Sequence, residues 1–430
     1  MPRIKLFTLL LLTSAFHLLS GLAQATPHIQ LPKTSLLAHE LAVIVNDDDP
    51  LSIKVAEYYK DKRKIPDKNI IHIHFKPGRP GISIKEFRKL KKQVDANTPE
   101  HIQAYALTWV APFRVGCMSI TTAFAMGFDK SYCAKGCKPT KPSPYFNSNS
   151  RQPYKDHGIR PTISIAATDF AQARKLIDRG VAADSRFPQG TAYLVSTSDR
   201  GRNTRAPLFP EIVKYMENLP LKTVVINTDY IESKNDVLFY FTGLVKVPKI
   251  NSLQYLPGAI TDHLTSAGGN LTGSKQMSSL RWLEAGATGS YGAVVEPCNF
   301  PQKFPNPGIV IDRYFNGETL LESYWKSVHM PGQGIFIGEP LANPFGGYAL
   351  RAGSDWLLIQ TQSLRPGAYL LLSSYHPGTG FELDRQLMLQ KRGMQALHLT
   401  NLSKPYYKLV RVNIQQKTEE PALNKDTKSQ

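Results

Sequence analysis

A short segment in the second half of the chain gathers residue types that perform acid–base and nucleophilic chemistry. Asp262 stands directly before His263, which suggests an imidazole oriented by a carboxylate as a general base. Ser266 follows three residues later, and Cys298 lies two residues beyond Glu296. A thiol or hydroxyl next to such an imidazole becomes a nucleophile. These five residues are therefore the catalytic candidates of a hydrolase; the alternatives are a hydrogen-bonded core histidine, a disulfide and ordinary turns.

Arginines form a second group of candidates, suited to anion binding. Asp199, Arg202 and Arg205 occur in one short run, and Arg114 occurs earlier in the chain. A guanidinium group holds a carboxylate or phosphate through two parallel hydrogen bonds. We take these four residues as ligand-binding candidates, with paired surface charge as the alternative.

No motif points to a metal or a cofactor. The run Asp47–Asp49 supplies only carboxylate oxygens, and its alternative role is a turn with charge at a helix N-terminus. A zinc site from Cys117, Cys133, Cys137 and His157 does not match the usual ligand spacing. P-loop, G-x-S-x-G, H-E-x-x-H and dinucleotide fingerprints are absent from the sequence. We predict no metal and no cofactor.

The candidates follow apolar segments that have the character of buried parallel strands. The predicted strands are 41–45, 70–75, 104–110, 192–196, 223–227, 237–241 and 291–295. The predicted helices begin at Pro50 and cover 84–94, 209–216, 277–284 and 320–328. This alternation predicts an α/β fold with a mostly parallel, doubly wound sheet and helices on both faces. Ligands bind beyond the carboxyl ends of such strands, so we expect the candidates along one rim.

The chain divides into segments of different character. Residues 26–350 form the predicted α/β domain, with a cysteine-containing insertion at about 111–160 that lacks periodicity. Short strands at 356–360, 368–372 and 409–414 predict a β-rich domain over 351–415, and 416–430 is a polar tail.

The first 25 residues predict export. Arg3 and Lys5 precede a leucine-rich run that ends at the small-residue site Ala23–Ala25, typical of a cleaved signal peptide; an uncleaved anchor is the alternative. No later segment is apolar for long enough to span a membrane, so we expect a periplasmic or extracellular protein. Disulfides are the default in that setting. The four cysteines allow three pairings, one of which joins Cys133 to Cys137 and Cys117 to Cys298.

The net charge of the 430 residues is +18, and the 42% of hydrophobic residues excludes a disordered chain. Residues 51–100 are basic and lie partly on one face of the predicted helix 84–94. This surface is either solvated or attracts an anionic polymer or lipid at the cell envelope. Nucleic acid is not expected as a partner, because no binding motif or interleaved stacking aromatics occur.

Three segments, Trp109–Val115, Pro257–Ser266 and Gly286–Asn299, resemble an uncharacterised family of exported bacterial proteins found in genomes that carry exosortase, a proposed envelope protein-sorting system. The resemblance covers roughly residues 40–350. Because the C-terminus has no hydrophobic sorting helix, it implies a companion of that system rather than a sorted cargo.

A more distant resemblance is to gingipain-type cysteine peptidases with the caspase-like fold. The segments that carry it are 41–75, Phe241–Gly243, Gly286–Thr288, Glu318–Glu322 and Ile337–Leu341. Those peptidases place His-Gly where this chain has Leu244-Val245, and a cysteine near 259–266, where this chain has none. The resemblance therefore implies the fold without the His-Cys dyad. We expect a binding or envelope-assembly protein, with a hydrolase or peptidase using His263 and Cys298 as the alternative.

Overall fold

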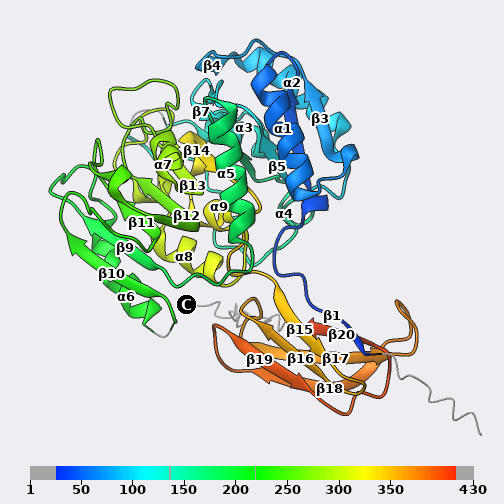
Figure 1. Cartoon of the computed structure of the whole chain (residues 1–430). Coiled ribbons are helices and arrows are strands. Elements are labelled where there is room, and N and C mark those ends of the chain that lie inside the picture. The colour runs from blue at the N-terminus through cyan, green and yellow to red at the C-terminus, as the bar shows by residue number, and fades with distance from the viewer. Residues whose placement is uncertain (1–25, 135–136, 218, 413–430) are drawn as a thin grey trace, which may run out of the picture.

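The computed structural model describes residues 26–134, 137–217 and 219–412. It has two parts, which are separate in Figure 1. The first, here called the α/β body, is built on a ten-stranded sheet. The second, called the β-rich part, lies below the body in the figure and contains the last six strands together with the first one.

The ten-stranded sheet of the body has the order β10-β9-β11-β12-β13-β14-β8-β5-β2-β3. Its strands are β2 (Leu41–Asn46), β3 (Ile70–Ile73), β5 (Ala104–Leu107), β8 (Thr162–Ser164), β9 (Thr191–Ser196), β10 (Lys222–Asn227), β11 (Val237–Thr242), β12 (Tyr255–His263), β13 (Gly289–Ala293) and β14 (Gly334–Gly338). Neighbouring strands pair in parallel from β10 to β13 and from β8 to β3. β14 is antiparallel to β13 and meets β8 through one bridged pair. Short β4 (Gly81–Ile82), β6 (Arg114–Val115) and β7 (Met118–Ser119) form a separate small sheet.

The first crossover shows how the local sequence sets these elements. Every residue of β2 is buried, as a strand covered on both faces requires. Asp49 then caps the next helix by accepting a hydrogen bond from the Leu51 amide, and Pro50 occupies its first turn. That helix ends at Lys64, which adopts the left-handed conformation, and the chain returns to β3.

Helices pack on the sheet in pairs. The helices are α1 (Pro50–Arg63), α2 (Ile84–Asn97), α3 (Ile120–Met126), α4 (Pro153–His157), α5 (Phe170–Ala183), α6 (Phe209–Met216), α7 (Leu280–Ala285), α8 (Pro307–Phe315) and α9 (Leu320–Ser327). α1 packs against α5, and α8 packs against α9. In α9 a capping box between Thr319 and Glu322 satisfies the first backbone amides.

The β-rich part consists of two small sheets around its own apolar core. Its strands are β1 (His28–Gln30), β15 (Tyr348–Ala352), β16 (Leu357–Thr361), β17 (Gly367–Ser374), β18 (Glu382–Leu389), β19 (Gln395–Leu399) and β20 (Tyr406–Arg411). β1 pairs in parallel with β20, so the start of the described chain is built into the sheet formed by its end. Sequence reasoning placed only the later strands here.

The predicted fold class is confirmed: the body is a mostly parallel α/β sheet with helices on both faces, and a β-rich part follows it. Several elements were not predicted, among them β8, β12, β14, α5 and α8. The predicted helix 277–284 is α7, which begins at Leu280. The predicted signal peptide, residues 1–25, and the predicted polar tail, residues 416–430, lie outside the described residues. No helix within the described ranges is long and apolar enough to cross a membrane.

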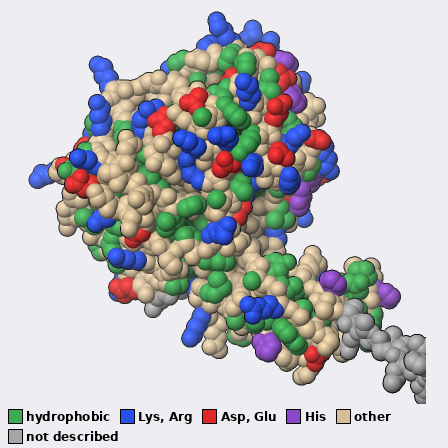
Figure 2. All heavy atoms as spheres, in the orientation of Figure 1, with side chains coloured by type: hydrophobic (Ala, Val, Ile, Leu, Met, Phe, Trp, Pro, Cys, Tyr) green, Lys and Arg blue, Asp and Glu red, His purple; other side chains and the backbone are tan. Residues whose placement is uncertain are grey.

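Several basic side chains of the stretch 51–100 form ion pairs with neighbouring carboxylates. Lys91 binds Asp95 on α2, and Lys60 binds Asp67 at 2.8 Å. Figure 2 likewise shows acidic and basic side chains interspersed over the body on the face in view. The structure therefore favours a solvated surface with paired charges for this stretch over a continuous positive patch that would attract an anionic polymer or lipid.

Candidate functional site

A pocket of about 360 Å³ lies at the carboxyl ends of the strands of the body. Its wall comes from the loops after β9, β12 and β13, with Phe304 at the back and Cys137 from the insertion; we call it the rim pocket. The residues that line it are Cys137, Gly201, Arg202, Leu264, Thr265, Ser266, Glu296, Pro297, Cys298, Asn299 and Phe304. Four of the nine predicted site residues therefore meet in one place: Arg202, Ser266, Glu296 and Cys298.

Asp262 does not orient His263. Both belong to β12, and successive residues of a strand point to opposite faces of the sheet. The buried Asp262 carboxylate pairs instead with the buried guanidinium of Arg205. Arg205 also donates to the Thr242 carbonyl at 2.7 Å and the Pro305 carbonyl at 3.0 Å. Burial raises the pKa of Asp262, and the attraction of Arg205 opposes that rise. This pair holds the loop after β9 to the sheet.

His263 has both ring nitrogens occupied inside the protein. The Trp282 indole donates to Nδ1 at 2.9 Å, and Nε2 lies 3.0 Å from the Met277 carbonyl, so the ring carries its proton on Nε2. The side chain is fully buried, and burial lowers its pKa to about 4. In this arrangement the ring is neutral and has no nitrogen available to accept a proton from a nucleophile.

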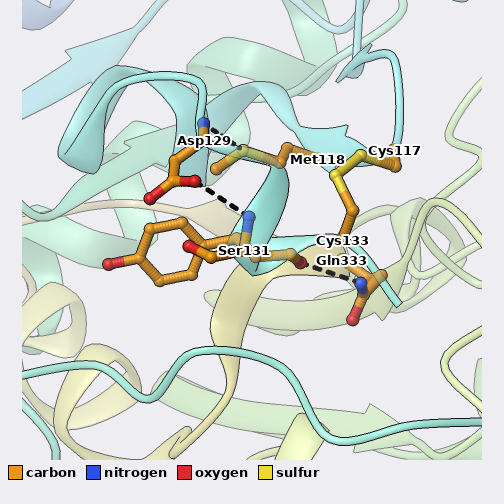
Figure 3. Close-up of a disulfide and its surroundings, with 7 residues drawn as sticks. Cys117, Met118, Asp129, Ser131, Cys133 and Gln333 are labelled. Carbon is orange, nitrogen blue, oxygen red and sulfur yellow. Dashed lines mark hydrogen bonds between the residues drawn. A yellow bond between two sulfur atoms is a disulfide. The ribbon is translucent and has the colours of Figure 1, made fainter. Parts of the chain in front are cut away.

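All four cysteines are oxidised. Cys137 is bonded to Cys298, and Cys117 is bonded to Cys133, so the pairing that joins Cys133 to Cys137 is not the one adopted. Figure 3 shows the Cys117–Cys133 bridge beside Met118 and the turn that Asp129 caps. Cys298 therefore has no thiol to ionise in this state, although its disulfide borders the rim pocket.

Arg202 is the cation of the rim pocket. Its Nε donates to the Thr265 hydroxyl at 3.0 Å, and its Nη1 donates to Asp199 at 3.0 Å. Its Nη2 donates no hydrogen bond to any group within the described ranges. Gln276 accepts hydrogen bonds from Thr265 and from the amide of Ala267, which fixes the loop opposite the arginine. Thr265 and Asp199 thus hold the guanidinium of Arg202 in place, and its Nη2 remains available to donate to a ligand.

Ser266 and Glu296 supply the remaining polar groups. Ser266 is half-buried in the pocket wall, and Glu296 accepts a hydrogen bond from the Cys298 amide at 2.8 Å. Neither is paired with His263, whose two contacts are accounted for above. The buried Lys303 lies behind them; burial lowers its pKa, and the nearby Glu296 opposes that shift.

The other candidates lie apart from the rim pocket. Arg114 belongs to β6 and is exposed beside Gly81 of β4. Asp47 and Asp48 contact the exposed His72 and His74 next to β3. In the described part of the chain no group of three His, Cys, Asp or Glu side chains is arranged to hold a metal ion.

Sequence reasoning missed the residues that shape the pocket. Trp282 is separated from its partner His263 by 19 positions, and Gln276 is separated from Thr265 and Ala267 by 11 and 9 positions. No local sequence pattern links residues at these separations. The glycines offered a signal: the pair Gly268-Gly269 was interpreted only as a turn, and Gly243 and Gly292 were not considered for close backbone contacts. A Cβ on Gly292 would lie 2.4 Å from the backbone of Gly268, and one on Gly243 would lie 1.9 Å from the Arg202 carbonyl oxygen. These glycines let the pocket loops lie directly on the strands.

No protein-family model matches the chain, and no curated protein matches it. Among solved structures it is similar to a chain of the complex of Porphyromonas gingivalis RgpB pro- and mature domains, with 8% identity and a TM-score of 0.42; the match covers 87% of this chain and 100% of that one. A structure described as a protease has 10% identity and a TM-score of 0.41, covering 88% of this chain and 98% of the other. Both are what the chain is similar to in fold, and neither assigns it a reaction.

Proposed function

We propose that this protein is a binding protein without peptidase activity, and that its rim pocket holds the carboxylate of a short peptide segment against Arg202. The observation that supports this most is the contrast within the site. His263 has both nitrogens bonded and Cys298 is in a disulfide, whereas Arg202 faces the pocket with a guanidinium donor to spare. A positioned cation without a base–nucleophile pair suits recognition better than hydrolysis.

The rest of the pocket supports a peptide as the ligand. Leu264 and Phe304 offer apolar surface, while Ser266 and Asn299 offer hydrogen-bonding groups beside it. A mixture of apolar wall and a few placed polar groups is typical of small-ligand sites. The pocket volume of about 360 Å³ lies near the lower end of the range usual for such sites.

The test is binding of fluorescein-labelled Ala-Ala-Ala-Leu, measured by fluorescence anisotropy. Arg202→Gln removes the charge-assisted bond and is expected to weaken binding about 10- to 100-fold. The matched control is Arg200→Gln, because Arg200 is exposed and does not line the pocket. Equal binding of the peptide with an amidated C-terminus, or cleavage of the peptide by the oxidised protein, would contradict the proposal.

The alternative, a hydrolase around His263 and Cys298, needs the Cys137–Cys298 disulfide to be reduced and His263 to give up its bond from Trp282 or its bond to Met277. Ser266 and Glu296 line the same pocket as Cys298, so polar groups for such a reaction lie beside it. Hydrolysis of a casein substrate that appears on adding dithiothreitol and disappears in Cys298→Ser would favour it. Cys137→Ser, which leaves Cys298 as a thiol, is then expected to be active without reductant.

We further propose that binding takes place after export, in the periplasm or outside the cell. The signal-like N-terminal sequence and the two disulfides support this setting. A role beside an exosortase-type sorting system is suggested by the sequence resemblance alone. Pull-down from an exosortase-carrying bacterium with wild type and Arg202→Gln is its direct test: loss of a captured envelope protein in the variant is the expected result.

A further inference from the structure

A second and larger cavity, of about 910 Å³, lies where the β-rich part meets the body; we call it the junction cavity. Three stretches of chain form it: residues 32–34 near the start, 148–157 of the insertion, and residues of β17 and β20 with the segment that precedes β17. Nothing in the rim pocket belongs to it. Its size lies within the range usual for small-ligand sites.

Two arginines that line the junction cavity, Arg151 and Arg365, pair with one buried carboxylate that further cations also surround. Glu318 is fully buried and lies 2.9 Å from Lys326, 2.8 Å from Arg365, 3.4 Å from Arg313 and 2.5 Å from Arg151. Burial disfavours the charged form of Glu318, but the four cations outweigh it and hold its pKa at about 2. The carboxylate of Glu318 is thus shared by four positive groups. Two of these groups, Arg151 and Arg365, line the cavity.

The remaining charges do not restore the balance. Lys33 and Arg411 also line the cavity, and Asp156 is the only carboxylate that does so within the described residues. Lys33 is paired with Glu40 at 2.6 Å. Glu322, 4.0 Å from Arg151, and Asp312, which attracts Arg365, are further acids of this region. Cations still exceed carboxylates, which is unfavourable for buried groups unless an anion joins them.

Two arginines carry unused donors at this place. Nε of Arg365 is buried and has no hydrogen-bond partner among the described residues. Arg411 is exposed at the edge of the cavity; it donates from Nη2 to the Pro366 carbonyl, and it forms no ion pair with a carboxylate of the described chain. Burial lowers the pKa of Arg365 to about 10; Glu318 opposes this shift, while Arg151 and Arg313 add to it. A bound anion would relieve that crowding.

We propose that the junction cavity binds a small polyanion, through carboxylate or phosphate groups held by Arg151, Arg365 and Arg411. The ligand would contact both parts of the molecule at once, since Arg411 ends β20 whereas Arg151 belongs to the insertion of the body. Planar guanidinium groups match carboxylate and phosphate oxygens equally well, so the shared chemistry is the anionic group itself.

The experiment measures the thermal midpoint and the calorimetric affinity of the full chain with citrate and, separately, with inorganic pyrophosphate in 0.15 M NaCl. A ligand that binds only the folded protein raises the midpoint in proportion to its affinity. Binding of one or both anions is expected, and the tighter one identifies carboxylate or phosphate as the preferred group. No rise and no heat with either anion would overturn the proposal.

Arg411→Gln is expected to weaken the binding about tenfold, since one charge-assisted contact is lost. Arg351→Gln is the matched control, because Arg351 lies exposed on β15 and does not line the cavity. Lys33→Gln serves as a second lining variant if Arg411→Gln does not fold. An equal loss in the lining and control variants would mean general attraction to a basic protein and would overturn the site.

Discussion

At the scale of single residues, the pocket is defined by which groups are already engaged. His263 is held by the Trp282 indole and the Met277 carbonyl, and Asp262 is held by Arg205. A buried imidazole with both nitrogens bonded is stable when neutral, since its charged form would lose solvation and would have to give up the bond from Trp282. The engaged histidine is therefore a structural support of the loop that carries Thr265 and Ser266.

This state of His263 predicts a dependence of stability on pH. The pKa is about 4 in the folded protein and about 6.5 in the unfolded chain, so between these values only the unfolded chain binds the proton. The free energy of unfolding is expected to fall by about 3 kcal/mol as the pH is lowered from 7 to 4. Urea unfolding across this range is the measurement.

His263→Gln should lose this part of the dependence, while His398→Gln, an exposed histidine on β19, should keep it. The same pH profile in wild type and His263→Gln would show that the pKa of this imidazole is not lowered in the folded state.

At the scale of elements, the loops of the pocket depend on glycine contacts with the strands beneath them. Gly292 of β13 touches the backbone of Gly268, and the Gly269 amide donates to the Ala293 carbonyl at 2.8 Å. The Gly268-Gly269 pair is thus a close backbone approach, and it positions the segment that leads from Ser266 to α7.

Gly292→Ala is expected to lower the free energy of unfolding by about 1–3 kcal/mol, because its methyl group would overlap rigid backbone. It should also weaken peptide binding in the rim pocket. The matched control is Gly273→Ala, where a Cβ would meet nothing within 4 Å. Chemical denaturation of both variants measures the difference, and equal stabilities would show that the loop moves aside at no cost.

The sequence predicted the elements whose signal is local. Continuous apolar runs identified β2, β9 and β11, and the caps at Asp49 and Thr319 lie where helices were expected. β8 has only three residues, and in β14 only three apolar residues stand between two glycines. Apolar runs this short do not distinguish a strand from a loop or a helix segment. α5 did carry a signal, with Asp169 as its cap and Ala173, Leu176 and Ile177 buried on one face, and it was overlooked.

The site was predictable only as a region. The rule that ligands bind beyond strand ends predicted that the candidates share one rim, and four of them, Arg202, Ser266, Glu296 and Cys298, line the rim pocket. It did not reveal that Cys298 pairs with Cys137, 161 positions away, or that Trp282 reaches His263. Those contacts depend on tertiary packing, which no local spacing records.

At the scale of the whole molecule, the two disulfides constrain very different lengths of chain. Cys137–Cys298 joins residues separated by 161 positions, and Cys117–Cys133 joins residues separated by 16. In the chain-entropy treatment, closing the longer loop contributes about 5 kcal/mol and closing the shorter one about 3 kcal/mol. The longer link also ties the insertion to the end of β13.

We therefore expect the double variant Cys137→Ala, Cys298→Ala to lose about 2 kcal/mol more stability than Cys117→Ala, Cys133→Ala. Guanidinium unfolding under non-reducing conditions compares the two. Each pair serves as the control for the other, since the loops do not overlap in sequence. The reverse order would mean that native packing, rather than loop length, decides the contribution of each link.

The pairing of β1 with β20 also fixes an order of events during synthesis. Residues 28–30 emerge from the ribosome well before their partners at 406–408. Until those partners have been made, the first strand lacks the backbone bonds that it has in the folded protein. The β-rich part can therefore close only after residue 408 has emerged, while the body, whose strands all lie between, is free to assemble beforehand.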